Sequence, residues 1–126
     1  MSLEAQEKAW SIEKRTQSFA HAFRGIRVFL EVTPNAWIHI LAGAIVVILG
    51  FYLKVTTTEW LVLVLSMGLV FVTEAVNTAI EIDINLTSPA YHPYARDTKD
   101  VAAGAVLIAA TIAVIVGLII FLPKIL

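Results

Sequence analysis

The chain has 126 residues, of which 59% are hydrophobic and 15% charged, and its formal net charge at pH 7 is -1. This length accommodates one domain, and a soluble domain so small could not hide such an apolar fraction from water. The near-neutral charge provides no general attraction to nucleic acid, and the absence of cysteine excludes disulfides and thiolate metal sites. We therefore expect a single-domain, all-α integral membrane protein.

The first thirty residues are polar and then amphipathic. Residues 1–15 contain no short apolar run that ends in a cleavage site, so we expect no cleavable signal peptide. The segment 4–30 predicts a helix on the membrane surface, because four apolar residues recur at helical intervals: Phe19, Phe23, Ile26 and Leu30. His21, Arg24 and Arg27 lie on a neighbouring face, where they either meet anionic headgroups or form one wall of a phosphate site.

Three apolar stretches follow, at about 37–53, 60–82 and 101–122. At about 1.5 Å of rise per residue, each is long enough to cross, or nearly cross, a hydrocarbon core about 30 Å thick. The polar segment 54–59 joins the first two, and we expect a longer loop over 83–100 between the second and the third. The sequence therefore predicts three transmembrane helices.

The distribution of Lys and Arg indicates the orientation. With the N-terminus inside, seven of the nine basic residues fall on the inner side: Lys8, Lys14, Arg15, Arg24, Arg27, Arg96 and Lys99. Only Lys54 and Lys124 fall outside, which agrees with the positive-inside rule. We therefore expect the N-terminus and the loop 83–100 in the cytoplasm, where ATP is.

The second apolar stretch carries carboxylates and amides. Glu74, Asn77 and Glu81 are spaced i, i+3, i+7, which places them within about 60° on one helical face, and Asn85 extends that face. An ionisable group inside a span costs on the order of 3 kcal/mol, so this face should meet protein or water. Hydrogen bonding between helices is the alternative explanation, but two carboxylates and two amides on one face favour a functional site.

Depth separates the two carboxylates. Glu74 lies about two turns inside the helix end, where it is suited to act as a general base. Glu81 lies near the cytoplasmic boundary, where a hard carboxylate can hold Mg²⁺ beside nucleotide phosphates. At the start of the third span, Lys99 would bind phosphate as a point charge, and Asp100 would cap the helix or fix a neighbouring donor. The alternative is a snorkelling lysine beside a capping aspartate.

Together these segments resemble the prokaryotic integral-membrane diacylglycerol kinase family, which has an undecaprenol kinase branch. The resemblance covers about 18–122 and rests on EAVNTAIE at 74–81, KDVAAGAV at 99–106, the N-terminal helix and the three short spans. It implies a homotrimeric helical bundle in the bacterial inner membrane, with active sites between subunits. It also implies transfer of phosphate from Mg-ATP to a lipid hydroxyl.

By position, the resemblance implies that Glu74 is the catalytic base, that Asn77 is the amide beside it, and that Glu81 binds metal and ATP. Further ATP contacts are implied at five positions that match the family: Arg15 (or Lys14), Tyr91, His92, Lys99 and Asp100. We expect the lipid to contact Arg24, Asn35 and Trp37.

The chain departs from the family in its metal ligands. The family has a second metal-binding glutamate eight residues after the glycine that is Gly25 here, but this position is Thr33. Glu31, two residues earlier, is the expected substitute. The aspartate four residues after the metal-binding glutamate is Asn85, and an aromatic expected near position 21 is His21.

Two alternatives accompany the predicted diacylglycerol kinase. One is an undecaprenol kinase, because PNAWIH at 34–39 looks more like that branch. The other is a non-enzymatic transporter or assembly subunit that uses Glu74 and Glu81 as a proton relay. A relay is disfavoured because mainly Leu, Val and Met lie between Glu74 and the outer face, interrupted only by Thr73 and Ser66.

Overall fold

In the computed structural model, which describes residues 2–9 and 11–126, the chain forms five helices and no strand. They are α1 (Leu3–Ala9), α2 (Ile12–Val32), α3 (Pro34–Tyr52), α4 (Thr57–Thr87) and α5 (Pro93–Ile125). The last three are long and apolar enough to cross a membrane, so the predicted all-α membrane architecture with three spanning helices is confirmed.

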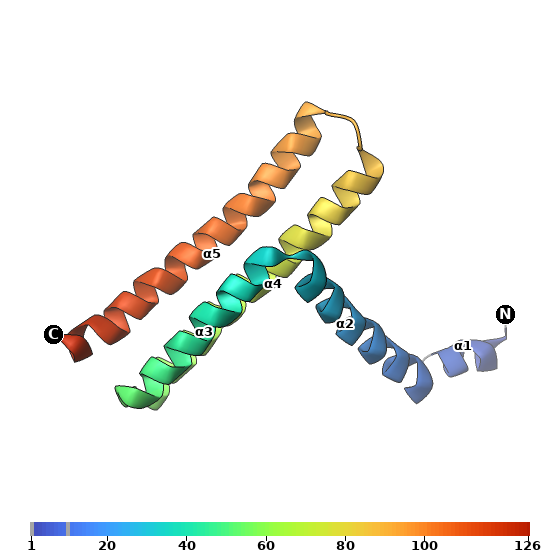
Figure 1. Cartoon of the computed structure of the whole chain (residues 1–126). Coiled ribbons are helices and arrows are strands. Elements are labelled where there is room, and N and C mark those ends of the chain that lie inside the picture. Colours follow the sequence, from blue (N-terminus) through green and yellow to red (C-terminus); the bar gives the residue numbers. More distant parts are fainter. Residues whose placement is uncertain (1, 10) are drawn as a thin grey trace.

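The helix α4 is central to the packing. Figure 1 shows α4 and α5 as a long antiparallel hairpin, with α3 lying along the part of α4 far from the hairpin tip. Buried residues recur every three or four positions along α4: Leu63, Ser66, Val70, Glu74 and Thr78. At the end far from the tip, Lys124 of α5 forms an ion pair of 3.1 Å with Glu59 of α4. The Glu74 carboxylate therefore lies on the same buried stripe of α4 as the apolar core residues.

The expected loop over 83–100 is wrong in extent. Residues 83–87 continue α4 and residues 93–100 begin α5, so only 88–92 connect the two helices. Pro93 takes the first helical position of α5, and the His92 imidazole Nδ1 accepts a hydrogen bond from the Tyr94 amide at 3.1 Å. Hydropathy marks where apolar residues end, whereas capping and proline decide where a helix ends.

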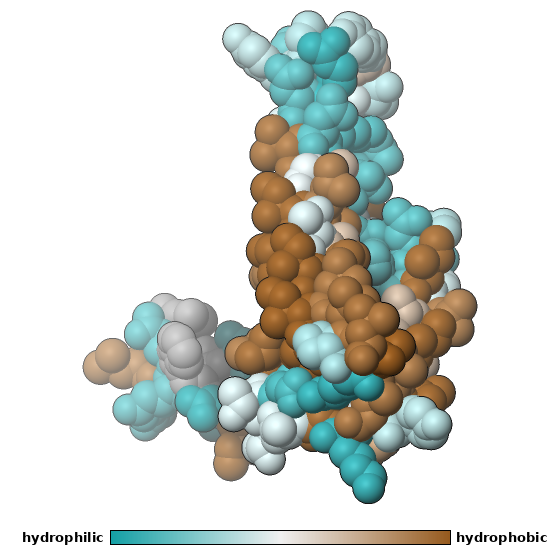
Figure 2. Space-filling view, turned by 90° about the vertical axis from the view of Figure 1, so that its left-hand side faces the viewer, coloured by the Kyte–Doolittle hydropathy of each residue, from teal (hydrophilic) through white to brown (hydrophobic). Residues whose placement is uncertain are grey.

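The hairpin tip is polar. The 31 residues of α4 give a helix about 47 Å long at 1.5 Å per residue, against a hydrocarbon core about 30 Å thick. Figure 2 shows hydrophilic side chains gathered over this tip, and below it a hydrophobic band on the face of the hairpin that is in view. The polar ends of α4 and α5 therefore extend beyond the apolar band as helix.

The N-terminal segment also differs from the expected single helix over 4–30. It is divided into α1 and α2, with Ser11 as the N-cap of α2, and Trp10 lies outside the described residues. The chain turns again at Pro34, which lacks the backbone N–H that would continue α2 and becomes the first residue of α3. Figure 1 shows that α2 consequently leaves the bundle at an angle, beside the middle of α4.

Candidate functional site

The candidate site is built where the α2–α3 junction meets α4. Thr33, between these two helices, is buried, and its hydroxyl shares a 2.7 Å hydrogen bond with the hydroxyl of buried Thr78 on α4. At about 1.5 Å per residue, Glu74 lies about 6 Å from Thr78 along α4 in the direction away from the hairpin tip. Glu81 lies about 4.5 Å from Thr78 toward the tip. The junction therefore separates the two carboxylates.

Glu74 is the buried carboxylate of the site. Its side chain is only 2% exposed, and no hydrogen bond to its carboxylate is formed by any described residue. The nearest group that can carry a positive charge is the imidazole of His39 on α3, whose Nε2 lies 4.0 Å from the Glu74 Oε1. A carboxylate with free lone pairs can accept a proton from a hydroxyl group that reaches it. These surroundings suit a general base.

His39 is a residue of the site that the sequence analysis missed. Its ring packs edge-on against Phe71 on α4, with a centroid distance of 6.3 Å and an interplanar angle of 75°. The signal was present, because His39 is an ionisable residue within the apolar stretch 37–53. The rule that singled out Glu74 therefore applies to His39 as well.

Asn77 faces a different neighbour from Glu74. It lies in a groove of about 670 Å³ between α4 and α5, which Thr73 and the hairpin residues Tyr94, Asp97 and Thr98 also line. The amide oxygen Oδ1 of Asn77 is buried and has no hydrogen-bond partner among the described residues. Buried polar atoms usually find a partner, so this unpaired oxygen makes Asn77 a candidate for a contact outside the described residues.

The hairpin places a positive charge beyond the junction. The Lys99 ammonium on α5 donates a 2.6 Å hydrogen bond to the Asn85 side-chain oxygen on α4, one turn beyond exposed Glu81. Because Asn85 is neutral, this bond positions the ammonium without neutralising it. Asp100, the next residue on α5, is exposed. The arrangement holds Lys99 ready for an anion.

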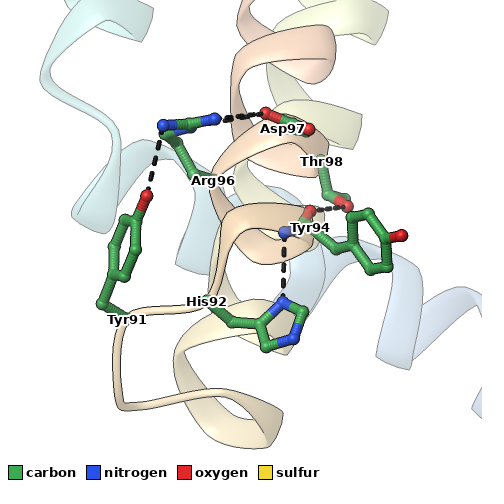
Figure 3. A network of polar contacts seen from close by, with 6 residues as sticks. All are labelled: Tyr91, His92, Tyr94, Arg96, Asp97 and Thr98. Carbon is green, nitrogen blue, oxygen red and sulfur yellow. Dashed lines mark hydrogen bonds and ion pairs between the residues drawn. The ribbon is translucent and has the colours of Figure 1, made fainter.

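Tyr91 and His92 lie at the tip of the hairpin (Figure 3). The Arg96 guanidinium donates a 3.2 Å hydrogen bond to the Tyr91 hydroxyl and pairs with Asp97 at 3.2 Å. The Thr98 hydroxyl donates to the Tyr94 carbonyl at 2.7 Å. The Tyr91 side chain remains 76% exposed, so its ring is accessible although its hydroxyl is bonded. These contacts order the short connection between α4 and α5.

The expected metal ligands are not gathered at one place in the described part of the chain. Glu31 on α2 is exposed and paired with Arg27 at 3.7 Å, while the Thr33 hydroxyl is occupied by Thr78. Within residues 2–9 and 11–126, no three His, Asp or Glu side chains lie close enough to hold a metal ion. Mg²⁺ is commonly bound by one or two carboxylates together with substrate phosphates and water, and exposed Glu81 fits that requirement.

The N-terminal candidates lie at different distances from the junction. Trp37 is 58% exposed, and its indole N–H donates a 2.9 Å hydrogen bond to the Leu30 carbonyl across the α2–α3 break, next to exposed Asn35. Along α2, Arg24 lies about 13 Å from Thr33 and Arg15 about 27 Å, at 1.5 Å per residue. One copy of the chain therefore does not bring Arg15 to Glu81 or Lys99.

Comparison with known proteins places these residues in a familiar sequence context. The family model described as prokaryotic diacylglycerol kinase matches residues 20–121, which include every candidate except Arg15 and its alternative Lys14. An undecaprenol kinase of Bacillus subtilis (strain 168) is 43% identical over 108 residues, or 86% of this chain and 88% of that protein. A diacylglycerol kinase of Synechocystis sp. is 37% identical over 123 residues, covering 96% of this chain and 70% of that protein. A diacylglycerol kinase of Helicobacter pylori is 26% identical over 106 residues, covering 79% of this chain and 83% of that protein.

Proposed function

This chain belongs to the prokaryotic diacylglycerol kinase family and is therefore a lipid kinase, and we propose that Glu74 is the base that activates the lipid hydroxyl. The observation that supports this role is the nearly complete burial of Glu74 below the α2–α3 junction, next to a single imidazole. Because the chain is a kinase with an alcohol as acceptor, the alternative of a non-enzymatic transporter is dropped.

The two ends of the site suit the two substrates. Glu74 and Glu81 are about 10 Å apart along α4, the first buried and the second exposed and nearer the polar hairpin tip. A lipid hydroxyl would reach Glu74 from the bilayer, while the triphosphate of ATP would lie beside Lys99 in water. We propose that the hairpin tip and the N-terminus face the cytoplasm of the bacterial inner membrane, with the exposed Phe19 and Phe23 of α2 resting on its surface.

The chemistry is direct phosphoryl transfer. Glu74 takes the proton of the lipid hydroxyl as the hydroxyl oxygen bonds to the γ-phosphorus, and the bond from that phosphorus to the oxygen bridging the β- and γ-phosphates breaks, so ADP leaves. Lys99 stabilises the negative charge that spreads over the transferred group. Glu81 would hold the Mg²⁺ that accompanies ATP, an ion that supplies further neutralisation of phosphate charge. Tyr91, His92 and Asp100 surround the nucleotide end.

We propose diacylglycerol as the acceptor, in keeping with the family and with the relatives from Synechocystis sp. and Helicobacter pylori. Undecaprenol is the second candidate, because the Bacillus subtilis relative with 43% identity is an undecaprenol kinase. Asn35 and Trp37 are exposed at the junction, where either lipid would pass on its way to Glu74.

A two-lipid assay tests both the activity and the acceptor. Purified protein in vesicles containing either diacylglycerol or undecaprenol is given ATP labelled at the γ-phosphate, and labelled lipid is measured at several lipid concentrations. We expect a higher kcat/KM for diacylglycerol than for undecaprenol. A higher value for undecaprenol would establish the second candidate, and absence of label on both lipids would contradict a lipid kinase with either acceptor.

Replacement of Glu81 by glutamine tests the metal role. The variant should require about ten-fold more Mg²⁺ for half-maximal activity, because a neutral amide binds a hard cation less strongly than a carboxylate does. The measurement is a magnesium titration at saturating ATP and lipid. Asp83→Asn is the matched control, since Asp83 is also an exposed carboxylate of α4 but projects from a different face. An unchanged titration in Glu81→Gln would remove Glu81 from the site.

We further propose a homotrimer whose active sites lie between subunits. The support is the distance of about 27 Å along α2 that separates Arg15 from the junction in its own chain. Glu74→Gln and Arg15→Gln subunits, each of low activity alone, should regain activity when they are co-assembled from a denatured mixture. If each site takes Glu74 and Arg15 from different subunits of a symmetric trimer, an equal mixture recovers about a quarter of the wild-type rate. No recovery in verified mixed trimers would place both residues in one subunit.

A further inference from the structure

The pairing of His39 with Glu74 connects two spanning helices inside the apolar band. The imidazole Nε2 lies 4.0 Å from the Glu74 Oε1, and the His39 side chain is 23% exposed whereas that of Glu74 is 2% exposed. Phe71, three residues before Glu74 on α4, packs edge-on against the imidazole and restricts its orientation. The helix α4, which carries Glu74, therefore also holds the His39 ring facing the carboxylate.

Other charged groups near the site are engaged elsewhere or lie farther away. Glu31 on α2 is exposed and pairs with Arg27, and on α5 the Lys99 ammonium is bonded to Asn85. Glu81 lies about 10 Å from Glu74 along α4 at 1.5 Å per residue. In the part of the chain that the structure describes, His39 is the one potential cation within 4.0 Å of the Glu74 carboxylate.

We propose that His39 is a positioning residue for Glu74, aiming the carboxylate at the acceptor hydroxyl and, as an imidazolium, keeping it ionised until it takes the proton. This inference rests on the function proposed for Glu74. The gap of 4.0 Å exceeds a hydrogen bond, so Nε2 and Oε1 must approach by about 1 Å when the substrates bind. Catalytic hydrogen bonds are often long before substrate binding and shorten in the reactive complex. The acceptor O–H bond breaks, the new O–H bond forms on Glu74, and His39 keeps its own proton.

The competing explanation is that His39 only fills space between α3 and α4. His39 borders a mostly apolar groove of about 490 Å³ together with Gly43, Met67 and Phe71. A phenylalanine side chain would fill the same position. The two explanations differ in what they require of the ring. Packing needs only its shape, whereas positioning needs a nitrogen that donates to Glu74.

Two substitutions separate shape from hydrogen bonding. His39→Phe keeps an aromatic ring against Phe71 but removes the donor, and His39→Gln places an amide nitrogen near the position of Nε2. In vesicles, His39→Phe should lower kcat by about 10–100-fold, the usual loss for a group that orients a functional side chain, with the KM for ATP and for lipid changed by less than about two-fold. His39→Gln should recover about ten-fold of that loss. Leu41→Phe, an exposed position on the same helix, is the matched control.

The pH profile provides a second readout that packing alone would not change. If the charge of the imidazole matters to Glu74, part of the pH dependence of the wild-type kcat comes from His39. Glutamine carries no ionisable group, so that part should be absent from the profile of His39→Gln. If His39→Phe does not assemble, the profile of His39→Gln alone decides: a profile identical in shape to that of the wild type contradicts the proposal.

Different results would contradict the positioning role of His39 and the base role of Glu74. Full kcat in a folded His39→Phe variant, or equal losses in the Phe and Gln variants, would overturn the positioning role while leaving Glu74 as the base. Near-normal activity in Glu74→Gln would instead overturn the base assignment, whatever the His39 variants do.

Discussion

Glu74→Gln is expected to abolish lipid phosphorylation while leaving the protein inserted in the membrane. Glutamine matches glutamate in size but does not take a proton at neutral pH, so the acceptor hydroxyl loses its base. General-base catalysis ordinarily contributes about 10²–10⁴-fold, and a loss of this size would leave little measurable transfer. The measurement is the transfer of labelled γ-phosphate to the preferred lipid in reconstituted vesicles.

The fold of Glu74→Gln should survive the change. Glu74 is 2% exposed, and glutamine has nearly the same size and shape, so the packing of α4 against α3 should be preserved. Thermal unfolding in detergent, followed by circular dichroism, should therefore show a midpoint close to that of the wild type. Glu59→Gln is the matched control, because Glu59 belongs to the same helix but lies about 22 Å away at 1.5 Å per residue. Glu59→Gln should retain transfer, and a fully active Glu74→Gln would disprove the base role.

Lys99→Met is expected to lower kcat/KM for ATP by about 10²–10³-fold. Methionine keeps much of the apolar stem but removes the ammonium, and groups that stabilise transition-state charge are ordinarily worth this much. The effect should be large here because Asn85, the residue that bonds the ammonium at 2.6 Å, is neutral and leaves its charge for phosphate. Initial rates over a range of ATP concentrations at saturating lipid measure the change.

Lys99→Arg and Lys54→Met provide the comparison for this loss. Arginine keeps the positive charge and should recover part of the rate, although its planar group does not reproduce a point charge. Lys54 lies in the connection between α3 and α4, far along α4 from the hairpin tip, so its loss should leave kcat/KM for ATP unchanged. If Lys99→Met altered only the KM for lipid, Lys99 would not belong to the nucleotide end.

Local pattern was enough to predict the three spanning helices and the stacking of Glu74, Asn77 and Glu81. Hydropathy and helical period depend on neighbouring residues alone, so both are legible before any tertiary contact is known. The ends of the helices could not be predicted from the same pattern. The polar residues 83–87 and 93–100 were expected in a loop but are helical, because helix continues wherever capping and backbone geometry permit, whether or not the side chains are apolar.

The separation of Glu74 from Glu81 by depth also followed from sequence position, and the structure agrees in burying the first and exposing the second. Their surroundings did not follow from it. Glu74 turns toward α3 and His39, whereas Asn77 borders the groove against α5. A shared helical face does not specify which neighbouring helix each residue meets, because that depends on how the helices pack.

Composition, helical period and motif are properties of the chain alone, and they were sufficient to identify a three-span membrane protein of the lipid kinase family with carboxylates in its second span. The packing of the helices was needed to show that Thr33, at the position of an expected metal ligand, bonds Thr78 and so fixes where the start of α3 meets α4. It alone brought His39 to Glu74, 35 positions later in the chain. Such contacts join residues distant in sequence, and they arise from helix packing rather than from any local pattern.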